Sequence, residues 1–96
     1  MEGIRYVYSM GYTSNAAEEL AHLLFSHSPG GLSKAIFVNS GSEATDAALK
    51  LASQYWIERG QPRLTNFIAR DQSYHGNTLG ALSVSGHASR RVFYTP

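Results

Sequence analysis

The sequence predicts an α/β protein built around one βαβ unit, and two observations support this fold class. A short apolar run, residues 35–38, is followed at once by small polar residues and then by a stretch with helical periodicity. A second short apolar run, residues 66–70, comes after that stretch. Together they cover residues 34–70, close to the ~30-residue size of a βαβ unit. We therefore expect two parallel strands joined by a right-handed crossover helix, within a mainly parallel sheet flanked by helices.

Composition narrows the class of protein. The chain has 96 residues, of which 43% are hydrophobic, a net charge of +1 and no cysteine. The length suits a single domain, residues 1–96. The low charge argues against nucleic acid and acidic membranes as partners, and the lack of cysteine excludes thiolate catalysis, disulfides and cysteine-based zinc sites. Because no segment could span a membrane and no signal-peptide pattern opens the chain, we expect a cytoplasmic protein. We assign no metal site.

The N-terminal third predicts one helix. Residues 1–12 contain spaced tyrosines and suit a short strand or an extended lead-in. Residues 13–15 offer three candidate N-caps, and Asn15 with Glu18 has the spacing of a capping box. The apolar side chains that follow share one helical face: Ala17, Leu20, Ala21 and Leu24. The Pro-Gly-Gly run at residues 29–31 should end this helix.

The crossover helix is the most clearly specified element. Ser40 and Glu43 have capping-box spacing, Asp46 and Lys50 could pair at i, i+4, and Gly60 should end the helix. Its small and apolar residues should pack closely against the sheet: Ala44, Ala47, Ala48, Leu51 and Tyr55.

A strand that passes through a small-residue turn into a helix can bind an anion. The first N–H groups of a helix lack intrahelical partners and carry partial positive charge. Gly41 would let a phosphate approach the backbone, and Ser40 or Ser42 would add a hydroxyl donor. An ordinary capped helix, with Glu43 closing the cap, is the commoner explanation of this pattern. Neither a Walker A loop nor a Gly-x-Gly-x-x-Gly run is present, so neither of these nucleotide-binding modes fits.

The loop after the second apolar run, residues 71–78, should emerge at the same edge of the sheet. It carries Tyr74, His75 and Gly76, which could place an aromatic ring and an imidazole beside a phosphate. A partly buried loop tyrosine and a structural histidine are the plainer alternatives. Ser42 and His75 could imitate a hydrolase pair, but no Gly-x-Ser-x-Gly elbow is present. Asn77 or Thr78 should cap a short helix ending near Gly86, followed by a loop over residues 87–96.

Two segments resemble one family. Residues 37–52, FVNSGSEATDAALKLA, resemble the phosphate-binding segment of class III aminotransferases, and residues 74–83, YHGNTLGALS, resemble that family's second motif at the family spacing. These are pyridoxal-phosphate enzymes of fold type I, the aspartate aminotransferase fold. The resemblance implies pyridoxal 5'-phosphate as cofactor. It also implies a phosphate held at Gly41 and Ser42 by backbone N–H groups and a hydroxyl, next to the candidate Ser40, and a pyridine ring stacked on Tyr74 beside the His75-Gly76 backbone.

The family's catalytic lysine has no counterpart in the sequence. A transaminase needs a lysine that forms a Schiff base with the cofactor. Lys34 begins an expected strand and Lys50 lies on the outer face of a helix, so neither is placed at the ligand edge. We therefore assign no catalytic residue and expect an incomplete part of the family's large domain, a fragment inactive alone.

The resemblance implies transfer of an amino group from an amine or amino acid to a 2-oxo acid or aldehyde. It also implies small-molecule substrates and a homodimer. The same motifs serve an aminomutase, a decarboxylase and racemases, so the sequence does not identify the substrates. Two alternatives stay open, a non-catalytic phosphate- or cofactor-binding module and a non-functional fragment.

Overall fold

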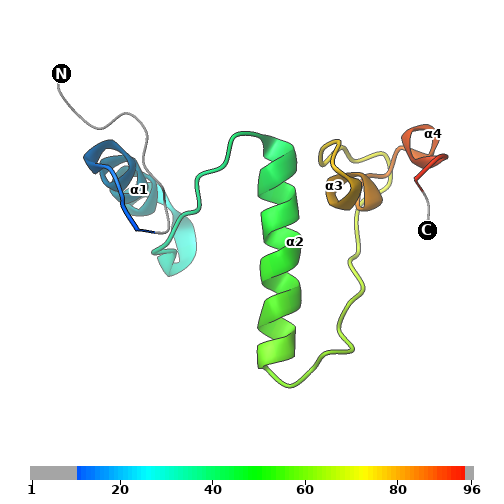
Figure 1. Ribbon diagram of the computed structural model, residues 1–96, viewed down its shortest axis with the longest axis horizontal. Helices are drawn as coiled ribbons and strands as arrows, with labels where there is room; N and C mark the ends of the chain where they lie inside the picture. The colour runs from blue at the N-terminus through cyan, green and yellow to red at the C-terminus, as the bar shows by residue number, and fades with distance from the viewer. Residues whose placement is uncertain (1–10, 95–96) are drawn as a thin grey trace. The chain divides into compact units, whose positions relative to one another are not determined.

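The computed structural model describes residues 11–94, and these fall into two compact units that divide between Ile36 and Phe37 (Figure 1). The elements, in chain order, are α1 (Asn15–His27), η1 (Pro29–Gly31), α2 (Gly41–Glu58), α3 (Leu79–Ser83) and α4 (Ala88–Arg91). Within the described residues, no helix is both long enough and apolar enough to cross a bilayer. The strand or lead-in considered for residues 1–12 falls almost entirely outside these residues.

The first unit contains α1, which confirms the predicted helix. Ser14, one of the three candidates, is the N-cap, and its Oγ accepts the N–H of Ala17 at 3.3 Å, so the capping box of Asn15 and Glu18 is wrong. Glu18 instead accepts the hydroxyl of Thr13 at 2.8 Å. The helix ends at His27, directly before the Pro-Gly-Gly run that forms η1, as expected.

The two predicted strands are wrong for this structure. Residues 32–38 and 64–70 have no regular secondary structure, and no strand occurs within residues 11–94, so neither the βαβ unit nor the parallel sheet is formed. The physical reason is pairing, because a strand satisfies its backbone groups only when a neighbour lies beside it. Residues 64–70 run back along α2 as an extended connection (Figure 1), and the Ile68 side chain is fully exposed.

The second unit is organised by α2, which begins and ends as predicted, with Ser40 as N-cap and Gly60, at φ +73°, just beyond Arg59. The predicted packing face is wrong in large part: Ala47 is half-buried, but Ala44 and Ala48 are exposed, and Leu51 and Tyr55 are each about half exposed because no sheet covers them. The half-buried side chains follow a different stripe of the helix, namely Ser42, Thr45, Asp46, Ala47, Leu49, Ala52 and Ser53. This stripe contacts α3 and the loop before it.

The packed part of this unit lies at the contact between α2 and α3. The buried residues within the described chain are Gly76, Ala81, Leu82 and Ser85. Gly80 permits the close approach, since a Cβ there would collide with the Asp46 carboxylate. Asp46 therefore lies against α3, and the predicted pair with Lys50 is not among the ion pairs of the described residues. The loop predicted for residues 87–96 is also wrong in part, because α4 forms there.

Candidate functional site

Hydrogen bonds cap the N-terminus of α2 but leave two backbone N–H donors without an acceptor among the described residues. Ser40 Oγ accepts the N–H of Glu43 at 3.2 Å, and the Ser40 carbonyl accepts that of Ala44 at 3.1 Å. The Glu43 carboxylate accepts the N–H of Asn39 at 2.6 Å, so this acid has the structural role that the sequence favoured. In the first turn of the helix, Gly41 to Ala44, the N–H groups of Gly41 and Ser42 have no acceptor within residues 11–94.

The loop of residues 71–78 begins with a tight turn. Ser73 donates its hydroxyl to the carbonyl of Arg70 at 2.6 Å, and the Asp71 carboxylate accepts the N–H of Gln72 at 3.0 Å. Gln72 has φ +57°, a left-handed conformation that is costly for a residue with a Cβ. Gly86 then donates its N–H to the carbonyl of Ser73 at 2.9 Å, which ties the turn to the segment after α3.

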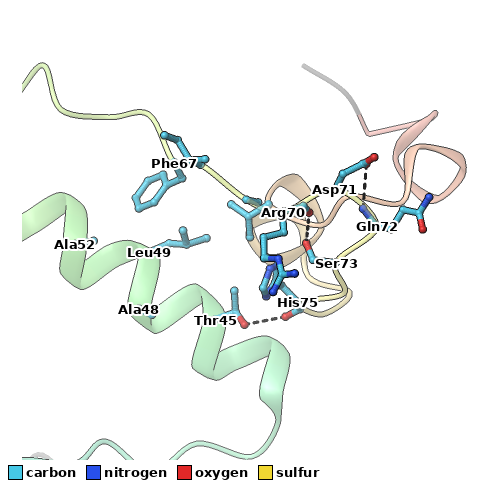
Figure 2. A pocket seen from close by; sticks show the side chains of 13 residues that line it. Thr45, Ala48, Leu49, Ala52, Phe67, Arg70, Asp71, Gln72, Ser73 and His75 are labelled. Atoms are coloured by element: carbon cyan, nitrogen blue, oxygen red, sulfur yellow. Dashed lines mark hydrogen bonds between the residues drawn. The ribbon is translucent and has the colours of Figure 1, made fainter.

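Three hydroxyl groups fasten the next part of this loop. Ser42 Oγ accepts the N–H of Asn77 at 2.9 Å, and Thr45 Oγ1 donates to the carbonyl of His75 at 2.8 Å (Figure 2). Ser85 Oγ accepts the N–H of His75 at 3.0 Å. The backbone of His75 is thus bound at both its N–H and its carbonyl, by side chains from two different parts of the unit.

Gly76 brings the loop against the helix. The residue is buried and has φ +134°, and a Cβ there would lie 2.5 Å from Ser42 Oγ and 2.9 Å from the Ala81 side chain. Real Cβ atoms do not approach other atoms so closely, so any side chain at this position would push the loop away from α2. Glycine is required here both by the space and by the backbone angle.

A cavity of about 380 Å³ lies between the helix N-terminus and this loop. Its lining comprises Ser40, Gly41, Ser42, Thr45, Tyr74, His75 and Gly76. All the residues selected from the sequence as cofactor-binding candidates therefore meet around one cavity, although two segments about thirty residues apart supply them. The Tyr74 ring is 58% exposed, and the guanidinium carbon of Arg90 lies 5.3 Å from its centroid, a cation–π distance.

The donor chemistry of this cavity fits a phosphorylated aromatic ligand. The open N–H groups of Gly41 and Ser42 point out of a helix N-terminus, where negative charge is stabilised. Because Ser42 Oγ accepts from Asn77, its own proton stays available for a phosphate oxygen. No carboxylate of the described residues lines the cavity to repel an anion, and the exposed face of Tyr74 offers a surface for stacking.

Three residues important to this geometry were not selected from the sequence: Thr45, Ser85 and Arg90. Thr45 follows Ser42 by three positions, so helical spacing places both side chains on one face, a signal that was present but unused. Ser85 lies in the short helix expected to end near Gly86, and nothing in its spacing indicates a bond to the loop. Arg90 lies in the segment that was expected to be a loop.

The larger neighbouring cavity, about 770 Å³, has a different character. It is lined mainly by apolar groups of α2 and of residues 67–69 (Figure 2), including Leu49 and Phe67. His75 also borders it, and no hydrogen bond of the imidazole occurs within residues 11–94. Ser42 Oγ bonds the Asn77 N–H and not the His75 ring, so the hydrolase pair is not formed. The described residues hold no group of three metal-ligating side chains.

Comparison with known proteins gives consistent matches. A profile of the family "Aminotransferase class-III" matches residues 3–94. An uncharacterized aminotransferase of Bacillus subtilis, YodT, is 46% identical over 95 residues, which are 99% of this chain and 21% of the relative. An omega-aminotransferase of Caulobacter vibrioides is 38% identical over 87 residues, 91% of this chain and 19% of the relative.

Solved structures match as well. A thermostable omega transaminase mutant from Pseudomonas jessenii superposes with a TM-score of 0.87 at 34% identity, over 95% of this chain and 20% of that one. A Bacillus anthracis aminotransferase gives a TM-score of 0.80, also at 34% identity, over 97% of this chain and 20% of that one. The chain thus spans about a fifth of the length of the proteins it matches.

Proposed function

We propose that this chain, which belongs to the class III aminotransferase family, binds the pyridoxal 5'-phosphate of that family in the cavity between α2 and the Tyr74 loop. Pyridoxal phosphate is the known cofactor of these enzymes. The proposal rests on one observation, the convergence of the two predicted segments on a single cavity with two open N–H donors at a helix N-terminus.

In this proposal the phosphate lies at the α2 N-terminus. Gly41 and Ser42 donate their N–H groups to it, and the hydroxyls of Ser40 and Ser42 are close enough in sequence to add donors. The Tyr74 ring supports the flat face of the pyridine, and the His75-Gly76 backbone forms the adjoining wall. The helix dipole supplies the favourable field, because neither a lysine nor an arginine of residues 11–94 lines this cavity.

The chain's own residues would bind and orient the cofactor. When bound, pyridoxal phosphate supplies an electron sink for chemistry at the carbon next to the substrate nitrogen. Lys34 and Lys50 do not line the cavity, so no residue in the described cavity is assigned to attach the cofactor covalently. Residues 1–96 would therefore act as one part of the family's cofactor-binding large domain.

The activity of the whole protein is proposed from the family. We expect transfer of an amino group from an amine or amino acid to a 2-oxo acid or aldehyde, in a homodimer, with small-molecule substrates. The omega-aminotransferase of Caulobacter vibrioides and the Pseudomonas jessenii transaminase support this reaction class. Nothing in the cavity selects a particular donor or acceptor.

The test uses a ligand that cannot react with lysines. Pyridoxine 5'-phosphate keeps the ring and the phosphate but has no aldehyde, so binding to the 96-residue chain reports the cavity alone. Gly41→Pro removes one N–H donor, and proline suits the first helical position after the extended Ser40. Since hydrogen bonds to charged groups contribute roughly 1.5–3 kcal/mol, affinity should fall about tenfold to a hundredfold.

Gly41→Ala is the matched control. It keeps the N–H, and its Cβ would meet no atom within 4 Å. Isothermal titration should therefore give this variant a higher affinity than Gly41→Pro, because only the proline variant loses the N–H donor. Equal affinities for the alanine and proline variants, or no binding by the unmodified chain, would contradict the proposal.

A further inference from the structure

The backbone of His75, next to the Tyr74 ring, is held by two side chains that the family motifs do not single out. We infer that Thr45 and Ser85 are positioning residues, which fix the stacking ring of Tyr74 at the helix N-terminus by binding the His75 backbone. This inference rests on the proposed function and deepens it. Thr45 acts from α2 through the carbonyl, and Ser85 acts from the segment after α3 through the N–H.

Thr45 makes a long-range hydrogen bond as well as the local one that is common for a threonine in a helix. Its Oγ1 lies 3.1 Å from the carbonyl of Gly41, four residues back, which is the common local bond. The contact with the His75 carbonyl is shorter, 2.8 Å, and joins residues thirty positions apart. The single hydroxyl proton of Thr45 can thus be donated to the His75 carbonyl, and the more distant Gly41 carbonyl is the weaker acceptor.

Contact with solvent cannot explain a hydroxyl group at Ser85. It is completely buried, and both hydrogen-bonding functions are used, since Oγ accepts from His75 at 3.0 Å and donates to the carbonyl of Ala81 at 2.8 Å. A purely apolar packing position would favour alanine, because a buried hydroxyl is tolerated only when it is bonded. The hydroxyl therefore connects the loop to α3.

The three bonds together define where the loop can lie. Ser42 binds Asn77 on the far side of Gly76, so the backbone from His75 to Asn77 is anchored on each side of the glycine. Tyr74 directly precedes this anchored stretch, so the position of the Tyr74 ring relative to Gly41 depends on how the backbone of residues 75–77 is held. Loss of one anchor should alter stacking without removing the N–H groups that bind phosphate.

The experiment separates positioning from general stability. Thr45→Val removes the hydroxyl and keeps the shape, whereas Thr45→Ser keeps the hydroxyl and serves as the rescue variant. We would measure the dissociation constants of pyridoxine 5'-phosphate and of inorganic phosphate for each chain. For Thr45→Val, pyridoxine 5'-phosphate should bind about tenfold more weakly, while inorganic phosphate stays within about twofold, and Thr45→Ser should restore the first value.

A second readout needs no ligand. Amide hydrogen exchange at His75 and Asn77 should accelerate in Thr45→Val and return toward the original rate in Thr45→Ser. Unchanged exchange, or an equal loss of affinity for both ligands, would overturn the positioning role. If the unmodified chain binds pyridoxine 5'-phosphate and Thr45→Val binds it equally well, only this inference fails. Absence of binding by the unmodified chain overturns the proposed function, and the inference with it.

Discussion

The two ends of α2 differ in how the chain around them is held. At its N-terminal end, bonds connect residues far apart in sequence, from Ser42 to Asn77, Thr45 to His75 and Ser73 to Gly86. At its C-terminal end the bonds are local, such as Gln61 N–H to the carbonyl of Trp56. The buried residues of the described chain also lie near the first end.

This difference shows which kind of contact stabilises each end of α2. The N-terminal end is completed by hydroxyls, a glycine and helix caps, whose contacts are all made by residues of the second unit. The C-terminal end and residues 61–70 carry large apolar side chains that stay exposed, among them Tyr55, Ile57 and Ile68. Burial of such side chains is the main favourable term in folding, and it requires a covering surface. The N-terminal end of α2, which carries the candidate site, is therefore the better packed of the two ends.

The largest expected effect comes from adding one methyl group at the packed end. Gly76→Ala should destabilise the unit by about 3 kcal/mol or more, because backbone strain and overpacking each cost on the order of 1–3 kcal/mol. The new Cβ would meet Ser42 Oγ at 2.5 Å. Urea unfolding, together with exchange of the Asn77 amide, would measure the loss.

Gly41→Ala is again the control, since it adds the same methyl group in open space. Its effect on the free energy of unfolding should stay within about 0.5 kcal/mol. A Gly76→Ala chain that unfolds at the same urea concentration as this control would show that the loop does not lie against α2.

A smaller loss is expected when a buried hydroxyl is removed. Ser85→Ala leaves the N–H of His75 and the carbonyl of Ala81 without their partner, at a cost of about 1–3 kcal/mol. Ser83→Ala is the matched variant, because Ser83 is exposed and only bonds back to Gly80 at 2.6 Å. Thermal unfolding should separate the two. Equal midpoints would mean that the Ser85 hydroxyl contributes nothing to the packed end.

Local signals predicted the parts of the fold that depend on local physics. The Ser40 cap, the end of α2 at Gly60 and the Thr78 cap of α3 each follow from residues within one or two turns. Both segments of the candidate site were found because glycine, serine and aromatic residues gather where strands were expected to end. The cavity brings them together even though no sheet forms in the described residues.

Features that depend on distant partners could not be predicted in this way. The strands expected at residues 35–38 and 66–70 need neighbours to pair with, and apolar character alone does not supply them. The packing face of α2 was predicted along Ala44, Ala48 and Leu51, which are exposed, whereas the stripe with Thr45 and Asp46 makes the contact with the loop and α3. The bonds of Thr45 and Ser85 to His75 depend on tertiary structure, which residue spacing does not encode.

The smallest effect on stability is expected at the exposed end. Ile68→Gln should change the free energy of unfolding by less than about 0.5 kcal/mol, because the side chain is fully exposed. Leu82→Ala, at a residue only 5% exposed, should cost about 2–3 kcal/mol or more in the same assay. Exposed apolar side chains favour association, so Ile68→Gln should also reduce self-association in sedimentation velocity, whereas Ile68→Val should not. If Ile68→Gln were as destabilising as Leu82→Ala, Ile68 would be buried in solution, and the two ends of α2 would not differ as described.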